Sequence, residues 1–235
     1  MNLFKKDGLK LKICGVATEE SVDICKEIDG IDALGFIPNV SVKDVHSDML
    51  SGEEISRLIG KMPYSMESVL LIKCDVEPTV LELIGKTRPT VVQIQKEVDK
   101  PDIVAGIRSH YRNLEIIKTI SVDCESTVGS LLQEISVFEP YIDAVNLDAR
   151  EPGHGFVHNW ELSAEIVRHV HDMNLKFVLA GGLNRDNLER AIDQVRPDMV
   201  DIMTGARLML GGKPVKRKLD AQKVMRIAEI VRKYK

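Results

Sequence analysis

Three pairs of polar residues are the part of this sequence best suited to acid and base chemistry. They are Lys12 and Cys14, Gln93 and Gln95, and Asn146 and Asp148. Residues two apart on a strand share a face, so an inward orientation of all three pairs would gather an ammonium, a thiol, amides and a carboxylate. A thiol and a carboxyl group with displaced pKa values can serve one substrate as base and acid. Each residue alone is equally compatible with a hydrogen-bonded buried polar group, but six on three strands favour a site.

Glycines near the C-terminus indicate a second kind of chemistry, the binding of a phosphate ester. Gly181 and Gly182 follow one apolar run, and Thr204 and Gly205 follow the next. Glycine lets backbone N–H groups approach an anion closely, and the loops after the last two strands of a barrel often form a phosphate site. A single Gly-Gly pair more often marks a turn, whereas two glycine-containing strand ends together favour the phosphate site.

Positioning these residues requires a repeated strand and helix unit, and the sequence contains eight such units. Short β-branched runs alternate with amphipathic segments throughout, which predicts a parallel sheet. The predicted strands are Leu9–Val16, Ala33–Ile37, Ser68–Cys74, Thr90–Gln95, Leu114–Val122, Ile142–Ala149, Lys176–Gly181 and Met199–Thr204. We therefore expect a single (β/α)₈ TIM barrel, an α/β fold spanning residues 1–235, with its site at the C-terminal ends of the strands.

The composition limits the binding partners and the cellular location that we expect. The net charge of −4 gives no field that attracts nucleic acid, and the short basic run from Lys213 to Lys218 does not change that. No apolar stretch is long enough to cross a bilayer and no signal core follows Met1, so we expect no membrane partner and a cytoplasmic location. The four cysteines form no CxxC pair and have no suitably spaced histidine, so we expect no metal.

The order of short motifs along the chain resembles that of phosphoribosylanthranilate isomerases, TIM-barrel enzymes of tryptophan biosynthesis. The motifs are Lys12 to Val16, Ala33 to Ile37, Val92-Gln93, Asn146 to Asp148, Gly153 to Gly155 before Trp160, Ala180 to Leu183, Ala191-Ile192, Arg196-Pro197 and Asp201 to Gly205. Because they span nearly the whole chain in the right order, the resemblance is more specific than any one motif.

This resemblance implies an intramolecular aldose–ketose isomerase. The family catalyses the Amadori rearrangement of N-(5-phosphoribosyl)anthranilate, in which an acid opens the sugar ring and a base removes the C2 proton. By position, Cys14 resembles the family's general base and Asp148 its general acid. The reaction requires no cofactor and no metal. The competing interpretation of Cys14 is a small buried hydrophobe.

The chain departs from the family pattern at positions that contact substrate. Lys43 stands where the family has an arginine for the anthranilate carboxylate, Gln95 replaces a histidine, and His154 lies between the glycines that follow the sixth strand. A lysine keeps the charge but loses the bidentate fork. His154 is either a ligand-binding or catalytic group or a solvated loop residue. Arg207, in place of an acid, forms either an anion contact or a surface salt bridge.

These departures leave more than one function open. The first is a divergent isomerase of the phosphoribosyl substrate, in which Lys43, Gln95 and His154 bind the substrate. The alternative is a paralogue without that activity, which binds or isomerises another phosphorylated sugar, since one barrel fold supports many chemistries. Both functions have a small phosphorylated sugar as partner, and the sequence is compatible with a monomer or a homodimer.

Overall fold

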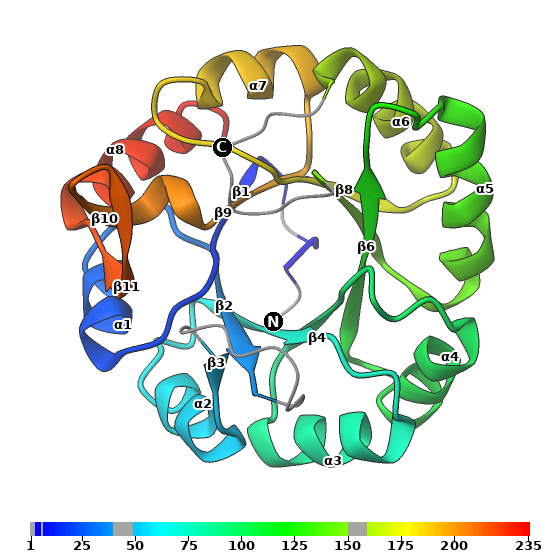
Figure 1. Cartoon of the computed structure of the whole chain (residues 1–235), viewed down its shortest axis with the longest axis horizontal. Coiled ribbons are helices and arrows are strands. Elements are labelled where there is room, and N and C mark those ends of the chain that lie inside the picture. The colour runs from blue at the N-terminus through cyan, green and yellow to red at the C-terminus, as the bar shows by residue number, and fades with distance from the viewer. Residues whose placement is uncertain (1–2, 6, 40–48, 150–158) are drawn as a thin grey trace.

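A closed barrel of parallel strands forms the centre of the molecule (Figure 1). The computed structural model describes residues 3–5, 7–39, 49–149 and 159–235. Within these residues the strands are β1 (Lys10–Ile13), β2 (Ala33–Pro38), β3 (Met49–Leu50), β4 (Glu67–Ile72), β5 (Val91–Ile94), β6 (Glu115–Val122), β7 (Ala144–Ala149), β8 (Lys176–Leu179), β9 (Met199–Ile202), β10 (Arg207–Leu210) and β11 (Lys213–Leu219). The sheet runs β1-β9-β8-β7-β6-β5-β4-β2-β3, and pairing of β1 with β2 closes the ring. The predicted TIM barrel is confirmed.

Helices cover the outside of this ring (Figure 1). In the described part of the chain they are α1 (Glu19–Lys26), α2 (Gly52–Ile59), α3 (Glu77–Thr87), α4 (Pro101–His110), α5 (Val128–Phe138), α6 (Trp160–Asp172), α7 (Leu188–Val195) and α8 (Ala221–Arg232), with short 3-10 turns at Glu139–Tyr141 (η1) and Thr204–Ala206 (η2). None of these helices has the length and apolar character needed to cross a bilayer.

Local sequence sets where the helices begin and end. Ser51 and Glu54 form a reciprocal capping box that starts α2. At the end of α7, Arg196 adopts a left-handed conformation with φ of 55°, and Pro197 follows it. Because proline disfavours helix in the residue before it, α7 ends at Val195, before Arg196-Pro197.

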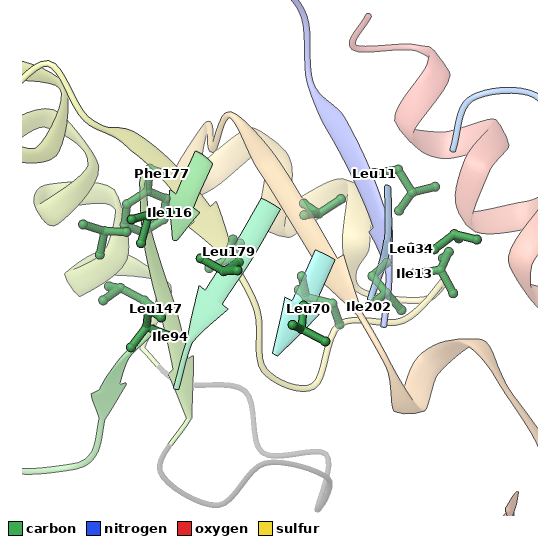
Figure 2. Close-up of a cluster of buried hydrophobic side chains, with 14 of the residues drawn as sticks. Leu11, Ile13, Leu34, Leu70, Ile94, Ile116, Leu147, Phe177, Leu179 and Ile202 are labelled. Atoms are coloured by element: carbon green, nitrogen blue, oxygen red, sulfur yellow. The ribbon is translucent and has the colours of Figure 1, made fainter. Parts of the chain in front are cut away.

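The strands alternate between two apolar layers. Leu11, Leu70, Ile94, Leu147 and Phe177 belong to the large core between strands and helices, as Figure 2 shows. Their strand neighbours point the other way, into the barrel, where a smaller apolar cluster includes Val69, Val91, Ile117 and Cys14. Residues that flank an outward leucine on one strand therefore face the barrel interior.

The N-terminal end of the barrel is closed by the start of the chain. Leu3 is buried in the interior cluster, and its backbone N–H donates to Glu115 Oε2 at 2.6 Å. Glu115 begins β6, so this contact lies at the amino ends of the strands. Burial raises the pKa of Glu115, while the N–H groups of Leu3 and Phe4 oppose that shift. With this end filled, access to the interior is from the carboxyl ends of the strands.

One feature absent from the sequence prediction is the hairpin of β10 and β11, which lies beside α1 and outside the ring (Figure 1). The basic run from Lys213 to Lys218 is its second strand rather than an unstructured segment. Gly211 and Gly212 connect the strands with φ of 57° and 77°. Two positive φ values are what a two-residue hairpin turn requires, so the Gly-Gly pair was the signal for it.

Lys118 is a buried lysine on the outer side of the barrel wall. Its ammonium donates to the Gln95 and Thr119 carbonyl oxygens at 3.2 and 3.1 Å and lies 4.8 Å from the centre of the Phe138 ring. Burial lowers its pKa to about 8, against the opposing charges of Glu134, Glu97 and Asp99. Folding therefore disfavours the charged form of this side chain.

Replacing Lys118 with methionine is expected to change how stability depends on pH. At about pH 7 the lysine is protonated in both folded and unfolded chains, and the depressed pKa corresponds to a penalty of roughly 3 kcal/mol. Above pH 8 the folded protein loses this proton first, so the penalty falls to roughly 1 kcal/mol near pH 10. The free energy of unfolding of wild type relative to Lys118→Met should therefore rise by about 2 to 3 kcal/mol between these pH values.

Urea unfolding of both proteins at the two pH values measures this change. Methionine at the exposed position of Lys213 is the matched control and should leave the difference from wild type independent of pH. A gap between wild type and Lys118→Met that stays constant with pH would contradict the expected titration.

Candidate active site

Lys12 lies at the centre of the barrel interior and is fully buried. Its ammonium donates to Gln93 Oε1 and to Asp201 Oδ2, each at 2.6 Å, and lies 3.6 Å from Cys14 Sγ. These partners come from β5, from β9 and from the residue that follows β1. A buried ammonium is costly unless it is paired and hydrogen-bonded, and here both conditions hold.

Cys14 directly follows β1 and points into the barrel beside Lys12. Gly35 of β2 makes room for both side chains. A Cβ on Gly35 would lie 2.9 Å from Lys12 Cε and 3.0 Å from Cys14 Sγ, tighter than nearly all real Cβ contacts. The sequence shows Gly35 in its motif, but its role as the space for this pair becomes evident only from the structure.

The electrostatics of the pair favour an ammonium next to a neutral thiol. Burial raises the pKa of Cys14 to about 11; the Lys12 charge opposes this shift and the Asp201 carboxylate adds to it. Burial by itself lowers the pKa of Lys12, but Asp201 and Cys14 outweigh that effect, and the pKa lies above its ordinary value. The pKa of Cys14 is therefore displaced toward the neutral thiol, and its role as the general base stays a prediction.

Thr119 connects the remaining interior amides. Its Oγ1 lies 3.2 Å from Gln93 Nε2, 3.2 Å from Asn146 Nδ2 and 3.5 Å from Gln95 Nε2. The structure therefore joins Gln93, Gln95 and Asn146 in one network with Lys12. Neither Thr119 nor Asp201 was among the predicted site residues. The polar alternation of Thr119 with Ser121 on β6 was the available signal for the first.

Asp148 lies on β7, two residues after Asn146 and opposite Ser121 of β6. Leu147 between them packs in the outer core, so Asp148 is on the inward side of the strand, where it is half-buried. β7 is separated from β1 by β8 and β9 in the ring. The predicted acid and base thus belong to well-separated strands and both face inward.

Three oxygen atoms on the inward faces of the strands are buried without a hydrogen-bond partner among the described residues. They are Asn146 Oδ1, Asp201 Oδ1 and Ser121 Oγ. Buried polar atoms in proteins are normally hydrogen-bonded, and such exceptions call for a functional or solvent partner. Because all three atoms belong to residues on the inward faces of their strands, a polar ligand bound inside the barrel at the carboxyl ends of the strands can provide that partner.

The two predicted phosphate loops, after β8 and β9, are in direct contact. Gly181 and Gly182 have φ of 87° and 66°, a backbone region that favours glycine. A Cβ on Gly205 would lie 2.2 Å from the Leu183 carbonyl oxygen, so only glycine permits this approach. Thr204 begins the 3-10 turn η2 that contains Gly205. Phosphate binding by these residues stays a prediction.

Arg207 is buried rather than at the surface. Its Nη2 donates to the Gly15 carbonyl oxygen at 2.8 Å. A Cβ on Gly15, whose φ is 70°, would approach the same nitrogen to 2.5 Å. The interpretation of Arg207 as a surface residue is wrong, because the side chain is buried and its guanidinium holds the turn that follows Cys14.

The other predicted residues are placed as follows. Lys43 and His154 lie outside the described residues. Cys25 is buried in the outer core, and Cys124 is exposed. Within the part of the chain that the structure describes, no three His, Cys, Asp or Glu side chains gather as a metal site.

Comparison with known proteins identifies the family. The family model "N-(5'phosphoribosyl)anthranilate (PRA) isomerase" matches residues 11–216. N-(5'-phosphoribosyl)anthranilate isomerase 1 of Methanosarcina mazei is 32% identical over 241 residues, which cover 97% of this chain and 97% of that protein. The chain belongs to the same family as these enzymes by both measures, and solved structures agree at the level of the fold.

The structure of N-(5'-phosphoribosyl)anthranilate isomerase from Pyrococcus furiosus has a TM-score of 0.76 at 21% identity, covering 96% of this chain and 99% of that chain. A phosphoribosyl anthranilate isomerase in complex with reduced 1-(O-carboxyphenylamino)-1-deoxyribulose 5-phosphate has a TM-score of 0.72 at 22% identity, with coverage of 96% and 99%. With the family match over residues 11–216, the chain is a member of the N-(5'-phosphoribosyl)anthranilate isomerase family.

Proposed function

We propose that the protein catalyses the Amadori rearrangement of N-(5-phosphoribosyl)anthranilate to the corresponding 1-deoxyribulose phosphate, as an isomerase of tryptophan biosynthesis. The observation that carries the proposal is the family match over residues 11–216, which runs from the strand before Cys14 to the hairpin after Gly205. A cytoplasmic location and a monomeric or homodimeric state belong to the same proposal.

In this mechanism the chain's own residues supply all the chemistry. Asp148 protonates the ring oxygen, which opens the sugar and leaves a Schiff base. Cys14, as a thiolate, then removes the C2 proton, and the enolamine becomes the aminoketone when C1 gains a proton and the C2 hydroxyl loses one. Acid and base acting at separate atoms of one substrate need separate positions, and the inward faces of β1 and β7 supply them.

The phosphate of the substrate is assigned to Gly181, Gly182, Thr204 and Gly205. Supporting this are the positive φ values of Gly181 and Gly182 and the close approach of Gly205 to the neighbouring loop. The phosphorylated ligand held by a related enzyme fits the same chemistry. Gln95, Lys43 and His154 are proposed to contact the rest of the substrate, with Lys43 near the anthranilate carboxylate.

The direct test is turnover of the fluorescent phosphoribosyl substrate by purified, folded protein. We expect substrate fluorescence to disappear at a rate proportional to enzyme concentration. A folded protein without turnover above background would remove the proposal. In that event, ribose 5-phosphate raising the melting temperature would favour the paralogue that binds another phosphorylated sugar.

A further inference from the structure

We propose that Lys12 is a positioning residue that favours the thiolate form of Cys14, and that Asp201 opposes it by competing for the same ammonium. The inference rests on the proposed function only in so far as Cys14 is the base of that reaction. The antagonism between Lys12 and Asp201 is a statement about the folded protein and is measurable without substrate.

The distances around the Lys12 ammonium show that Asp201 and Cys14 compete for it. Lys12 Nζ lies 2.6 Å from Asp201 Oδ2 and 3.6 Å from Cys14 Sγ, so the carboxylate holds the ammonium more closely than the sulfur does. Gln93 Oε1, also at 2.6 Å, fixes the ammonium from a third side. An opposite charge within about 4 to 6 Å favours the ionised form of a titratable group, and a like charge disfavours it. Lys12 therefore promotes the thiolate, and Asp201 suppresses it.

Burial makes these charges effective. Lys12 and Cys14 lie inside the barrel, and Asp201 is more than nine-tenths buried. Charges shielded from water interact more strongly than charges at a surface. Among the described residues, the Arg207 guanidinium also acts on Cys14 and favours the thiolate. Asp201 is thus the anion that counters two cations around one sulfur.

The second oxygen of Asp201 links this competition to substrate. Asp201 Oδ1 is buried and has no hydrogen-bond partner among the described residues. A substrate hydroxyl that donates to Asp201 weakens its hold on Lys12 and leaves more of the ammonium's charge for Cys14. The free protein then keeps a thiol, and the substrate complex gains a thiolate by releasing the thiol proton to solvent. When the thiolate takes the C2 proton it becomes a thiol again.

The pKa of Cys14, followed by NMR of an isotope-labelled cysteine β-carbon, tests the proposal without substrate. Asp201→Asn should lower the pKa of Cys14 by roughly one to three units, because the opposing charge is gone while Lys12 remains. Lys12→Met should raise it, and Lys12→Arg should restore part of the wild-type value. Asp198→Asn, at the amino end of the same strand, is the matched control and should leave the pKa of Cys14 unchanged.

An unchanged or raised Cys14 pKa in Asp201→Asn would overturn the proposal. If Lys12→Met fails to fold, the Asp201→Asn result decides alone, since that variant keeps an amide of the same shape. If the variants show the expected pKa shifts but the wild-type protein has no turnover, the catalytic role of Cys14 is refuted. The opposing effects of Lys12 and Asp201 on the Cys14 pKa would still stand.

The pH dependence of the steady-state kinetics distinguishes this positioning role from a purely structural one. The limb of the kcat/KM profile that rises with pH reports the pKa of the base in the free protein. The rising limb of the kcat profile reports its pKa in the substrate complex. In wild type the kcat limb should lie at lower pH than the kcat/KM limb, and in Asp201→Asn the two should draw together. Coincident limbs in wild type would contradict the link between substrate binding and Asp201.

Discussion

Replacing Cys14 with alanine is expected to lower kcat by about a hundredfold to ten-thousandfold, the range that a positioned general base contributes. The side chain follows β1, points into the barrel and lies 3.6 Å from a fully buried ammonium. Removing the thiol eliminates the proposed acceptor of the C2 proton. Substrate contacts elsewhere in the mouth are untouched, so KM should change far less. Steady-state turnover of the fluorescent substrate measures both parameters.

Cys25→Ala is the matched control for this substitution. Cys25 is also a fully buried thiol, and burial raises its pKa to about 12, but it lies on α1 in the outer core. We expect its removal to reduce stability modestly and to leave kcat near the wild-type value. Equal losses of kcat in the two variants would mean that Cys14 acts through packing rather than through chemistry.

The barrel was predictable because its strands are locally consistent. Every predicted strand overlaps an observed one, since buried parallel strands read as short β-branched runs whatever they pack against. The hairpin of β10 and β11 was missed because charged residues dominate its second strand. Lys213 and Lys216 are exposed, and among the described residues β11 pairs only with β10. The two-residue strand β3 is too short to carry a periodic signal.

The interior site was partly predictable. Alternation correctly placed Lys12, Gln93 and Asn146 on inward faces, because the period of two follows from strand geometry alone. Asp201 was not assigned a role, because its importance comes from an ion pair to a residue 189 positions away in sequence. No local pattern specifies which carboxylate meets a buried lysine. The parallel pairing of β1 with β9, the first and last strands of the barrel, creates that pair.

Arg207 illustrates the same limit. The sequence shows only a basic residue after a glycine-containing strand end, which fits a surface position as well as a buried one. In the structure its guanidinium, at the start of β10, reaches the Gly15 carbonyl oxygen in the turn after the first barrel strand. Contacts between the two ends of the chain depend on closure of the ring, so they follow from the fold rather than from neighbouring residues.

Asp148→Asn has a matched control on the same strand segment. Asp143 immediately precedes β7 at its amino end, pairs with Arg108 at 2.6 Å and accepts the Ile116 N–H. Asp143→Asn removes a carboxylate of comparable exposure at the closed end of the barrel. We expect it to affect stability without a change in kcat, so any common effect of the two variants would be structural.

Asp148→Asn itself should lower kcat by about a hundredfold to ten-thousandfold, because an amide cannot donate the proton that opens the sugar ring. Deuterium at C2 of the substrate separates this step from the one assigned to Cys14. With Asp148 replaced, ring opening becomes slowest and the isotope effect on kcat should fall toward unity. With Cys14 replaced, removal of the C2 proton becomes slowest and the isotope effect should increase. A large isotope effect in Asp148→Asn would place this carboxyl group in proton abstraction instead and would reverse the assignment of acid and base.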